Sequence, residues 1–294
     1  MTKLPDSGAL RALEEAAAKA YDVPRHAQVV AAPGSQAIIN WLPHLIPARR
    51  VGILGFSYSE FARSFAASGA KVTIAAEPAA LQHHDVAIIV NPNNPDGRLV
   101  ARQDLHVVAA ALADHRGLLI VDEAFADFVP AASIVPKMPA SGVIVLRSFG
   151  KTYGLPGLRL GFAIAPAGTA ARLRAALGPW PVSGAAIAIG TKALLDKEWL
   201  AATRERLQTD AAAVDKILAA AGFALVGATS LFRLVRHGET QRLYESLAQA
   251  GILTRRFDAR PDWLRFGIVS LPASRRRLRA ALGSGLQSQR LNAE

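Results

Sequence analysis

VLRSFGKTYGLPGLRLGF (145–162) joins an apolar, strand-like run to a glycine-rich loop that carries a single lysine, Lys151. The neighbouring glycines allow a ligand to approach the backbone closely. Arg159 adds a permanent positive charge, which lowers the pKa of a nearby amine and can bind a phosphate through its fork of donors. A neutral lysine amine is a nucleophile towards aldehydes. The segment therefore suits a covalent cofactor site. A solvated loop lysine beside an unrelated arginine is the alternative interpretation of the same sequence.

Strand-like and helix-like patterns alternate through the first 180 residues. Apolar runs predict strands at 28–32, 50–54, 70–76, 85–90, 117–122 and 142–147, and helical patterns occupy 8–21, 33–46, 59–68, 101–115 and 168–177. Short apolar strands separated by helices are typical of a mainly parallel sheet that is covered on both faces. We therefore expect an α/β fold, with a mainly parallel, mixed sheet sandwiched by helices, in a large domain over 1–180.

The pattern changes after residue 180. A long helical region, 181–222, precedes shorter strands at 229–235 and 263–269 and helices near 238–250 and 273–282. These elements predict a connector helix and a smaller C-terminal α+β domain over 181–294. The N-terminal helix is expected to belong to the large domain or to pack with the small one.

Polar residues directly follow several of the expected strands. They are Ser35 and Gln36 in PGSQ, Tyr58, Asn94 in NPNNPDG, Asp122 and Glu123, and Ser148 with Lys151. In open parallel sheets, ligands bind outside the carboxyl ends of the strands. The pattern thus predicts that an amide, an acid, an aromatic ring, a hydroxyl and a lysine meet at one edge of the sheet.

Each of these residues has a chemical and a purely structural interpretation. An aspartate at the end of a buried strand is costly unless it is paired, so Asp122 suits a protonated ring nitrogen. A helix cap or surface acid is the better interpretation of Glu123. Tyr58 is either a stacking plate for a planar ring or an ordinary half-buried tyrosine. Turn chemistry explains most of NPNNPDG, to which Asn94 adds a donor for a phenolate oxygen.

The composition excludes several kinds of site and several classes of protein. The chain has 294 residues, is 51% hydrophobic and contains no cysteine, so disulfides, thiolate metal sites and cysteine nucleophiles are excluded. The histidines are scattered without a His-Glu-x-x-His motif, and we expect no metal site. The net charge of +11 suits an anionic small substrate better than nucleic acid, because no basic stripe interleaved with aromatics is present. No apolar stretch could span a bilayer and no signal peptide is evident, so a cytoplasmic protein without membrane contact is expected.

Taken together, PGSQ, FSYSEF, NPNNPDG, VDEAFADF and SFGKTYGLPGLRLGF resemble the fold-type I pyridoxal phosphate enzymes, specifically the class I/II aminotransferase family. The resemblance covers nearly the whole chain. It implies that pyridoxal 5'-phosphate is joined covalently to Lys151, with Asp122 at the pyridine nitrogen, Asn94 at the ring 3-oxygen and Tyr58 near the ring face. It also implies a phosphate site formed by Ser35, Gln36, Ser148 and Arg159, an Arg265 that binds the substrate carboxylate, and a homodimer.

Within the family, the likeness is greatest to the threonine-phosphate decarboxylases of cobalamin biosynthesis. Phe125 is part of it, because many aminotransferases carry a tyrosine there. The resemblance thus implies a decarboxylase of L-threonine O-3-phosphate that yields (R)-1-aminopropan-2-ol phosphate. Alternatives are a histidinol-phosphate aminotransferase-like enzyme acting on another phosphorylated amino compound, or an inactive relative shortened at its N-terminus. The residues themselves leave decarboxylation and transamination open.

Overall fold

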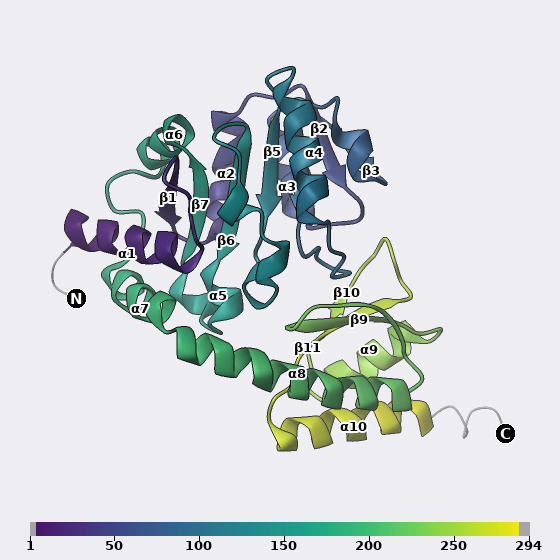
Figure 1. Ribbon diagram of the computed structural model, residues 1–294. Helices are drawn as coiled ribbons and strands as arrows, with labels where there is room; N and C mark the ends of the chain where they lie inside the picture. The colour runs from purple at the N-terminus through teal and green to yellow at the C-terminus, as the bar shows by residue number, and fades with distance from the viewer. Residues whose placement is uncertain (1–3, 288–294) are drawn as a thin grey trace. The chain divides into compact units, whose positions relative to one another are not determined.

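The computed structural model describes residues 4–287, and in it the chain divides into two compact units (Figure 1). The first unit consists of Met1–Asn94 and Leu99–Lys197, and the second of Pro95–Arg98 and Glu198–Glu294. The boundary expected at residue 180 therefore differs from the observed division, in which residues 181–197 belong to the first unit. The N-terminal helix α1 also belongs to the first unit, where it packs against α7.

The first unit is built on a seven-stranded sheet in the order β1-β7-β6-β5-β4-β2-β3. The strands are β1 (Ala27–Ala32), β2 (Arg50–Leu54), β3 (Lys71–Ala75), β4 (Val86–Val90), β5 (Leu118–Asp122), β6 (Val143–Ser148) and β7 (Gly161–Pro166). Strands β2 to β6 pair in parallel, whereas β7 is antiparallel to both of its neighbours. The expected α/β fold with a mainly parallel, mixed sheet is confirmed.

Helices cover both faces of this sheet. They are α1 (Ser7–Ala20), α2 (Ser35–Leu45), α3 (Ser59–Ala67), α4 (Arg102–Ala113), the one-turn α5 (Phe149–Thr152), α6 (Ala167–Leu177) and α7 (Gly184–Leu195). Side chains of α1, α4 and α7 share one hydrophobic core with alternate residues of the strands, and those of α2, α3 and α6 share the other. Strand β4 is buried along its whole length, as a central strand covered on both faces must be. Five short 3₁₀ turns complete the unit: Pro78–Leu81, Ala126–Phe128, Pro130–Ala132, Val135–Lys137 and Pro156–Leu158.

The second unit has a four-stranded antiparallel sheet in the order β10-β11-β9-β8. Its elements are α8 (Lys197–Ala220), β8 (Ala224–Ala228), β9 (Phe232–Arg236), α9 (Thr240–Gln249), β10 (Arg255–Arg256), β11 (Trp263–Gly267) and α10 (Pro272–Gln287). Helices α8, α9 and α10 share a separate core with β9 and β11. The expected smaller α+β part is therefore present. No helix within residues 4–287 is both long and apolar enough to cross a membrane.

Strands β7, β8 and β10 and a break within the region 181–222 were not expected from the sequence. The single helical region 181–222 is two helices, because the chain leaves the helical conformation at Asp196, whose ψ is 79°. Strand β7 begins within the segment 145–162 that was interpreted as a cofactor loop, and it shares Gly161 and Phe162 with that segment. Residues 149–160, which include the one-turn helix α5, connect β6 to β7, and β7 returns antiparallel to β6.

Candidate functional site

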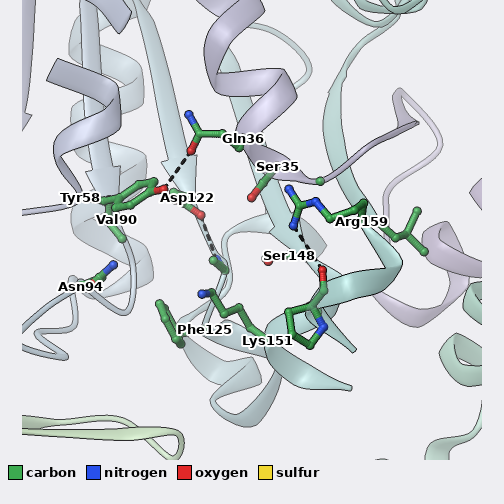
Figure 2. A pocket seen from close by; sticks show the side chains of 15 residues that line it. Ser35, Gln36, Tyr58, Val90, Asn94, Asp122, Phe125, Ser148, Lys151 and Arg159 are labelled. Atoms are coloured by element: carbon green, nitrogen blue, oxygen red, sulfur yellow. Dashed lines mark hydrogen bonds between the residues drawn. The ribbon is translucent and has the colours of Figure 1, made fainter. Parts of the chain in front are cut away.

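Polar side chains gather in one cavity of about 180 Å³ at the carboxyl ends of the central strands (Figure 2). Every residue that lines it belongs to the first unit. The lining includes all the predicted cofactor residues: Ser35, Gln36, Tyr58, Asn94, Asp122, Phe125, Ser148, Lys151 and Arg159. The parallel strands thus bring these distant residues together at the edge where ligands of such sheets bind.

Asp122, the last residue of β5, is the acid of the cavity. It is 4% exposed, and one carboxylate oxygen accepts a hydrogen bond of 3.0 Å from the backbone N–H of Ala124. Burial raises the pKa of Asp122 to about 6, although the Ala124 bond and the charge of Lys151 act to lower it. At neutral pH the carboxylate is therefore mostly ionised in a water-poor setting, which favours a cationic partner.

Lys151 lies in the one-turn helix α5 directly after β6. Its ammonium nitrogen is 5.7 Å from the centre of the Phe125 ring, and Figure 2 shows the two side chains next to each other. A Cβ at Gly150 would lie 2.7 Å from the Cα of Pro156, so glycine is needed where this turn meets the following loop. The close approach of Gly150 to Pro156 therefore fixes the position from which Lys151 enters the cavity.

An anion site lies beside the lysine, at the start of α2. Gly34 caps this helix with φ 88°, and a Cβ there would lie 2.6 Å from Nη2 of Arg159. A Cβ at Gly161 would lie 2.4 Å from the backbone nitrogen of Ser35. Both glycines therefore permit close approach, so that the free N–H groups at the start of α2 and the Arg159 guanidinium face the same space.

Tyr58 and Gln36 bind each other within the cavity. The Tyr58 hydroxyl donates to Oε1 of Gln36 at 2.9 Å (Figure 2). The Gln36 amide in turn donates to Oδ1 of Asn40 at 2.9 Å. The Gln36 side chain therefore orients the Tyr58 ring. For the expected phosphate site, Gln36 offers its backbone N–H at the start of α2.

The NPNNPDG turn positions Asn94 through its other two asparagines. Asn91 is fully buried and exchanges hydrogen bonds with the backbone of Val100, at 2.9 and 3.1 Å. Asn93 donates to the carbonyl of Phe56 at 3.0 Å and accepts from the Ser57 hydroxyl at 2.8 Å. Turn chemistry alone did not reveal these two roles. Asn91 holds the turn against Val100, and Asn93 ties it to the loop before Tyr58. Asn94, the next residue, lines the cavity.

The whole of this first unit and most of the second match one family model. Residues 1–280 match the model described as aminotransferase class I and II. The chain belongs to the aminotransferase class I and II family.

Relatives within the family carry more specific names. The chain is 45% identical over 253 residues to a threonine-phosphate decarboxylase of Sinorhizobium sp., covering 85% of this chain and 75% of the relative. It is 38% identical over 284 residues to the threonine-phosphate decarboxylase of Pseudomonas aeruginosa, covering 96% and 84%. The fold matches the crystal structure of histidinol-phosphate aminotransferase from Sinorhizobium meliloti in complex with pyridoxal-5'-phosphate, with a TM-score of 0.86 and 22% identity, covering 98% and 83%.

Arg265, the remaining residue predicted from the family motifs, lies on β11 in the second unit. It stands opposite Arg255 of β10 in the antiparallel register. Burial and the charge of Arg255 both lower the pKa of Arg265. Sequence reasoning did not single out Arg255, although its position in the arginine-rich stretch 254–266 was the available signal. Two arginines side by side favour an anion between them.

Proposed function

We propose that this chain decarboxylates L-threonine O-3-phosphate to (R)-1-aminopropan-2-ol phosphate, with pyridoxal 5'-phosphate as its cofactor, in cobalamin biosynthesis. The observation that carries the proposal is the 45% and 38% identity to two proteins named threonine-phosphate decarboxylase, over 85% and 96% of this chain. Phe125 at the cavity supports it, as the residue by which the motif resembled that branch of the family.

The cavity fits pyridoxal 5'-phosphate chemically. An ionised, buried Asp122 suits a protonated pyridine nitrogen, and Lys151 in the same cavity suits the aldehyde. Arg159, the hydroxyls of Ser35 and Ser148 and the N–H groups at the start of α2 suit the phosphate. Gly34 and Gly161 leave space that any side chain would fill. The donors, the acceptor and the nucleophile thus match the three reactive ends of the cofactor.

Bound there, the cofactor would withdraw electrons from the bond that breaks at the substrate Cα. Asp122 would keep the ring nitrogen protonated, because a carboxylate without water around it favours a neighbouring cation. Asn94 would donate a hydrogen bond to the ring oxygen, and Tyr58, oriented by Gln36, would cover the ring. The amine of Lys151 would deliver the proton that replaces CO₂ on Cα.

The two facing arginines support a substrate with more than one anionic group. We propose that Arg265 binds the substrate carboxylate and that Arg255, its cross-strand partner, adds charge for the phosphate. On this assignment Arg255→Met should raise KM for O-phospho-threonine at least about tenfold, as expected for losing one charged hydrogen bond. Affinity for pyridoxal 5'-phosphate should stay unchanged, which separates the two anion sites.

Transamination of a phosphorylated amino compound is the second candidate. It is favoured by the fold match to histidinol-phosphate aminotransferase, with a TM-score of 0.86. The same residues serve both reactions, since holding the Cα–H bond rather than the carboxylate in the reactive orientation would make Lys151 a base. An inactive relative is the third outcome of the same experiment.

The test supplies purified protein, pyridoxal 5'-phosphate and O-phospho-threonine. We expect CO₂ and aminopropanol phosphate in equal amounts, visible absorbance from bound cofactor, and borohydride fixation at Lys151. A keto acid formed only with an amino acceptor would support the aminotransferase, and neither product would support an inactive relative. If Lys151→Ala still fixes the cofactor, the lysine assignment is wrong.

We also propose that the protein is a cytoplasmic homodimer, as the family resemblance implies. Light scattering on the cofactor-loaded protein tests the assembly: a mass near twice 31.1 kDa is expected, and a mass near that of one chain contradicts it. Fractionation of producing cells tests the location.

A further inference from the structure

A buried ionic cluster lies on the face of β5 and β6 opposite to the cavity. Successive residues of a strand point to opposite faces. Val145 and Leu146 of β6 belong to different cores, so Arg147 shares the first face and Ser148, which lines the cavity, shares the second. The same alternation on β5 separates Glu123 from Asp122.

Arg147 binds two acids at once. Its Nη1 is 3.0 Å from Oδ1 of Asp127 and its Nη2 is 3.0 Å from Oε2 of Glu123. The side chain of Arg147 is 5% exposed, that of Asp127 is 8% exposed and that of Glu123 is 0% exposed. Ser133 donates to Glu123 at 2.6 Å, and the Tyr21 ring covers the guanidinium, with 4.5 Å from ring centre to Cζ. Glu123 is therefore not the surface acid that the sequence suggested.

The cluster is joined to both groups proposed to act on the cofactor. Thr152, the residue after Lys151 on α5, donates its hydroxyl to the second oxygen of Asp127. Glu123 follows Asp122 directly, and its backbone N–H bonds to Leu146 of β6 at 2.9 Å. One guanidinium therefore ties the turn that carries the lysine to the strand end that carries the acid.

Stability alone is a weak reason for such a cluster. A buried ion pair often contributes no more than apolar residues of the same volume would, because desolvation offsets the attraction. Burial raises the pKa of Glu123 against the lowering effect of Arg147, so the carboxylate does bear a desolvation cost. Unlike apolar packing, a charged guanidinium fixes the orientation of its partners, because its fork of donors sets their angle as well as their distance.

We propose that Arg147, bridging Glu123 and Asp127, is a positioning residue that holds Lys151 and Asp122 in register for cofactor capture. The inference rests on the proposed roles of Lys151 and Asp122. Arg147 and Thr152 do not line the cavity, so their effect on the cofactor passes through α5 and the end of β5.

Three substitutions of threonine test the link at Asp127. Thr152→Val removes the hydroxyl and keeps the shape, and Thr152→Ser restores it. Thr191→Val is the matched control, because Thr191 also lies in the first unit and bonds only a carbonyl of its own helix, that of Ile187, at 2.8 Å. Cofactor-free protein is mixed with pyridoxal 5'-phosphate, and the growth of visible absorbance is timed. Borohydride and peptide mapping then measure the fraction fixed at Lys151.

Thr152→Val should slow fixation at Lys151 about tenfold, the change expected for losing one hydrogen bond to a charged group. Thr152→Ser and Thr191→Val should stay within about twofold of wild type. Arg147→Lys keeps the charge but cannot bridge two acids with a fork, so it should slow fixation at least as much as Thr152→Val. The positioning role is overturned if Thr152→Val matches Thr191→Val, or if Arg147→Lys matches wild type.

Hydrogen exchange separates this inference from the proposed function. In the cofactor-free full chain, Thr152→Val should speed amide exchange in residues 149–153 about tenfold relative to Thr191→Val. If wild type never fixes the cofactor at Lys151, the proposed function fails, and this exchange measurement decides the cluster. Equal exchange in the two variants then overturns the inference as well.

Discussion

At the scale of single residues, Asp122 lowers the unfolding free energy of the protein when it carries the charge that its proposed role requires. Its pKa of about 6 in the fold lies above that of an unfolded aspartate, about 3.9. Between these values the folded protein binds more protons than the unfolded chain, so stability falls as pH rises through this window. The ionised carboxylate therefore costs the cofactor-free protein about 3 kcal/mol above pH 7.

Asp122→Asn should accordingly raise the unfolding free energy of the cofactor-free protein by up to about 3 kcal/mol at pH 8. The gain should shrink as pH falls through 6 and vanish near pH 4, while activity is lost at every pH. Denaturant titrations from pH 5 to 8 measure it. Asp85→Asn is the control of opposite sign. Burial acts to raise the pKa of Asp85, but hydrogen bonds from the N–H groups of Arg50 and Arg49 bring it below its usual value. A pH-independent gain in Asp122→Asn would contradict the assignment.

Gly34→Ala should weaken cofactor binding more than it weakens the fold. The new Cβ would meet the end of the flexible Arg159 side chain at 2.6 Å, so the guanidinium moves away from the start of α2 rather than the backbone. We expect the Kd for pyridoxal 5'-phosphate to rise at least about tenfold, measured by absorbance titration.

Gly69→Ala is the matched control for this change. Gly69 has φ 89° against 88° for Gly34, but a Cβ there meets no atom within 4 Å. Both variants place alanine at a positive φ, where a side chain is strained. Equal Kd values in the two would show that backbone strain, and not Arg159, governs the effect.

At the scale of elements, most of the first unit could be predicted because each strand is a short apolar run. The exception is β7, whose five buried residues 161–165 directly follow the lysine loop, and whose first two residues were interpreted as the end of that loop. Periodicity cannot identify a short, fully buried strand, and it gives no indication of the direction in which that strand runs.

The break at Asp196 illustrates a second limit. Alanine-rich sequence continues on both sides, so propensity predicts one helix. The chain bends there because α7 packs on α1 in the first unit while α8 beyond Lys197 belongs to the second. The bonds of Arg147 to Glu123 and Asp127 were equally hidden, because they depend on the parallel register of β5 and β6.

The contact of β7 with α2 is testable at this scale. A Cβ at Gly161 would lie 2.4 Å from the backbone nitrogen of Ser35 and 3.1 Å from the carbonyl oxygen of Arg147, neither of which can rotate away. Gly161→Ala should therefore destabilise the protein by about 1–3 kcal/mol and also weaken cofactor binding, because the start of α2 is displaced. Gly267→Ala, in a strand with no atom near the new Cβ, is the control, and thermal unfolding compares them.

At the scale of the whole molecule, the residues proposed to bind the cofactor and the arginines proposed to bind the substrate belong to different units. All the residues that line the cavity lie in the first unit, whereas Arg255 and Arg265 lie in the second. Each unit has its own core. Cofactor binding and substrate binding should therefore stabilise different parts of the chain.

Pyridoxal 5'-phosphate should slow amide exchange in β5, β6 and α5 of the first unit and leave β9 and β11 of the second unchanged. At a concentration of 100 Kd, it should stabilise the first unit by about 2.7 kcal/mol, since it binds the folded state of that unit alone. Adding inorganic phosphate instead should protect little, because it lacks the ring that Asp122 and Lys151 bind. Equal protection of β9 and β11 by the cofactor would contradict a site built from the first unit, because residues of both units would then have to respond to it.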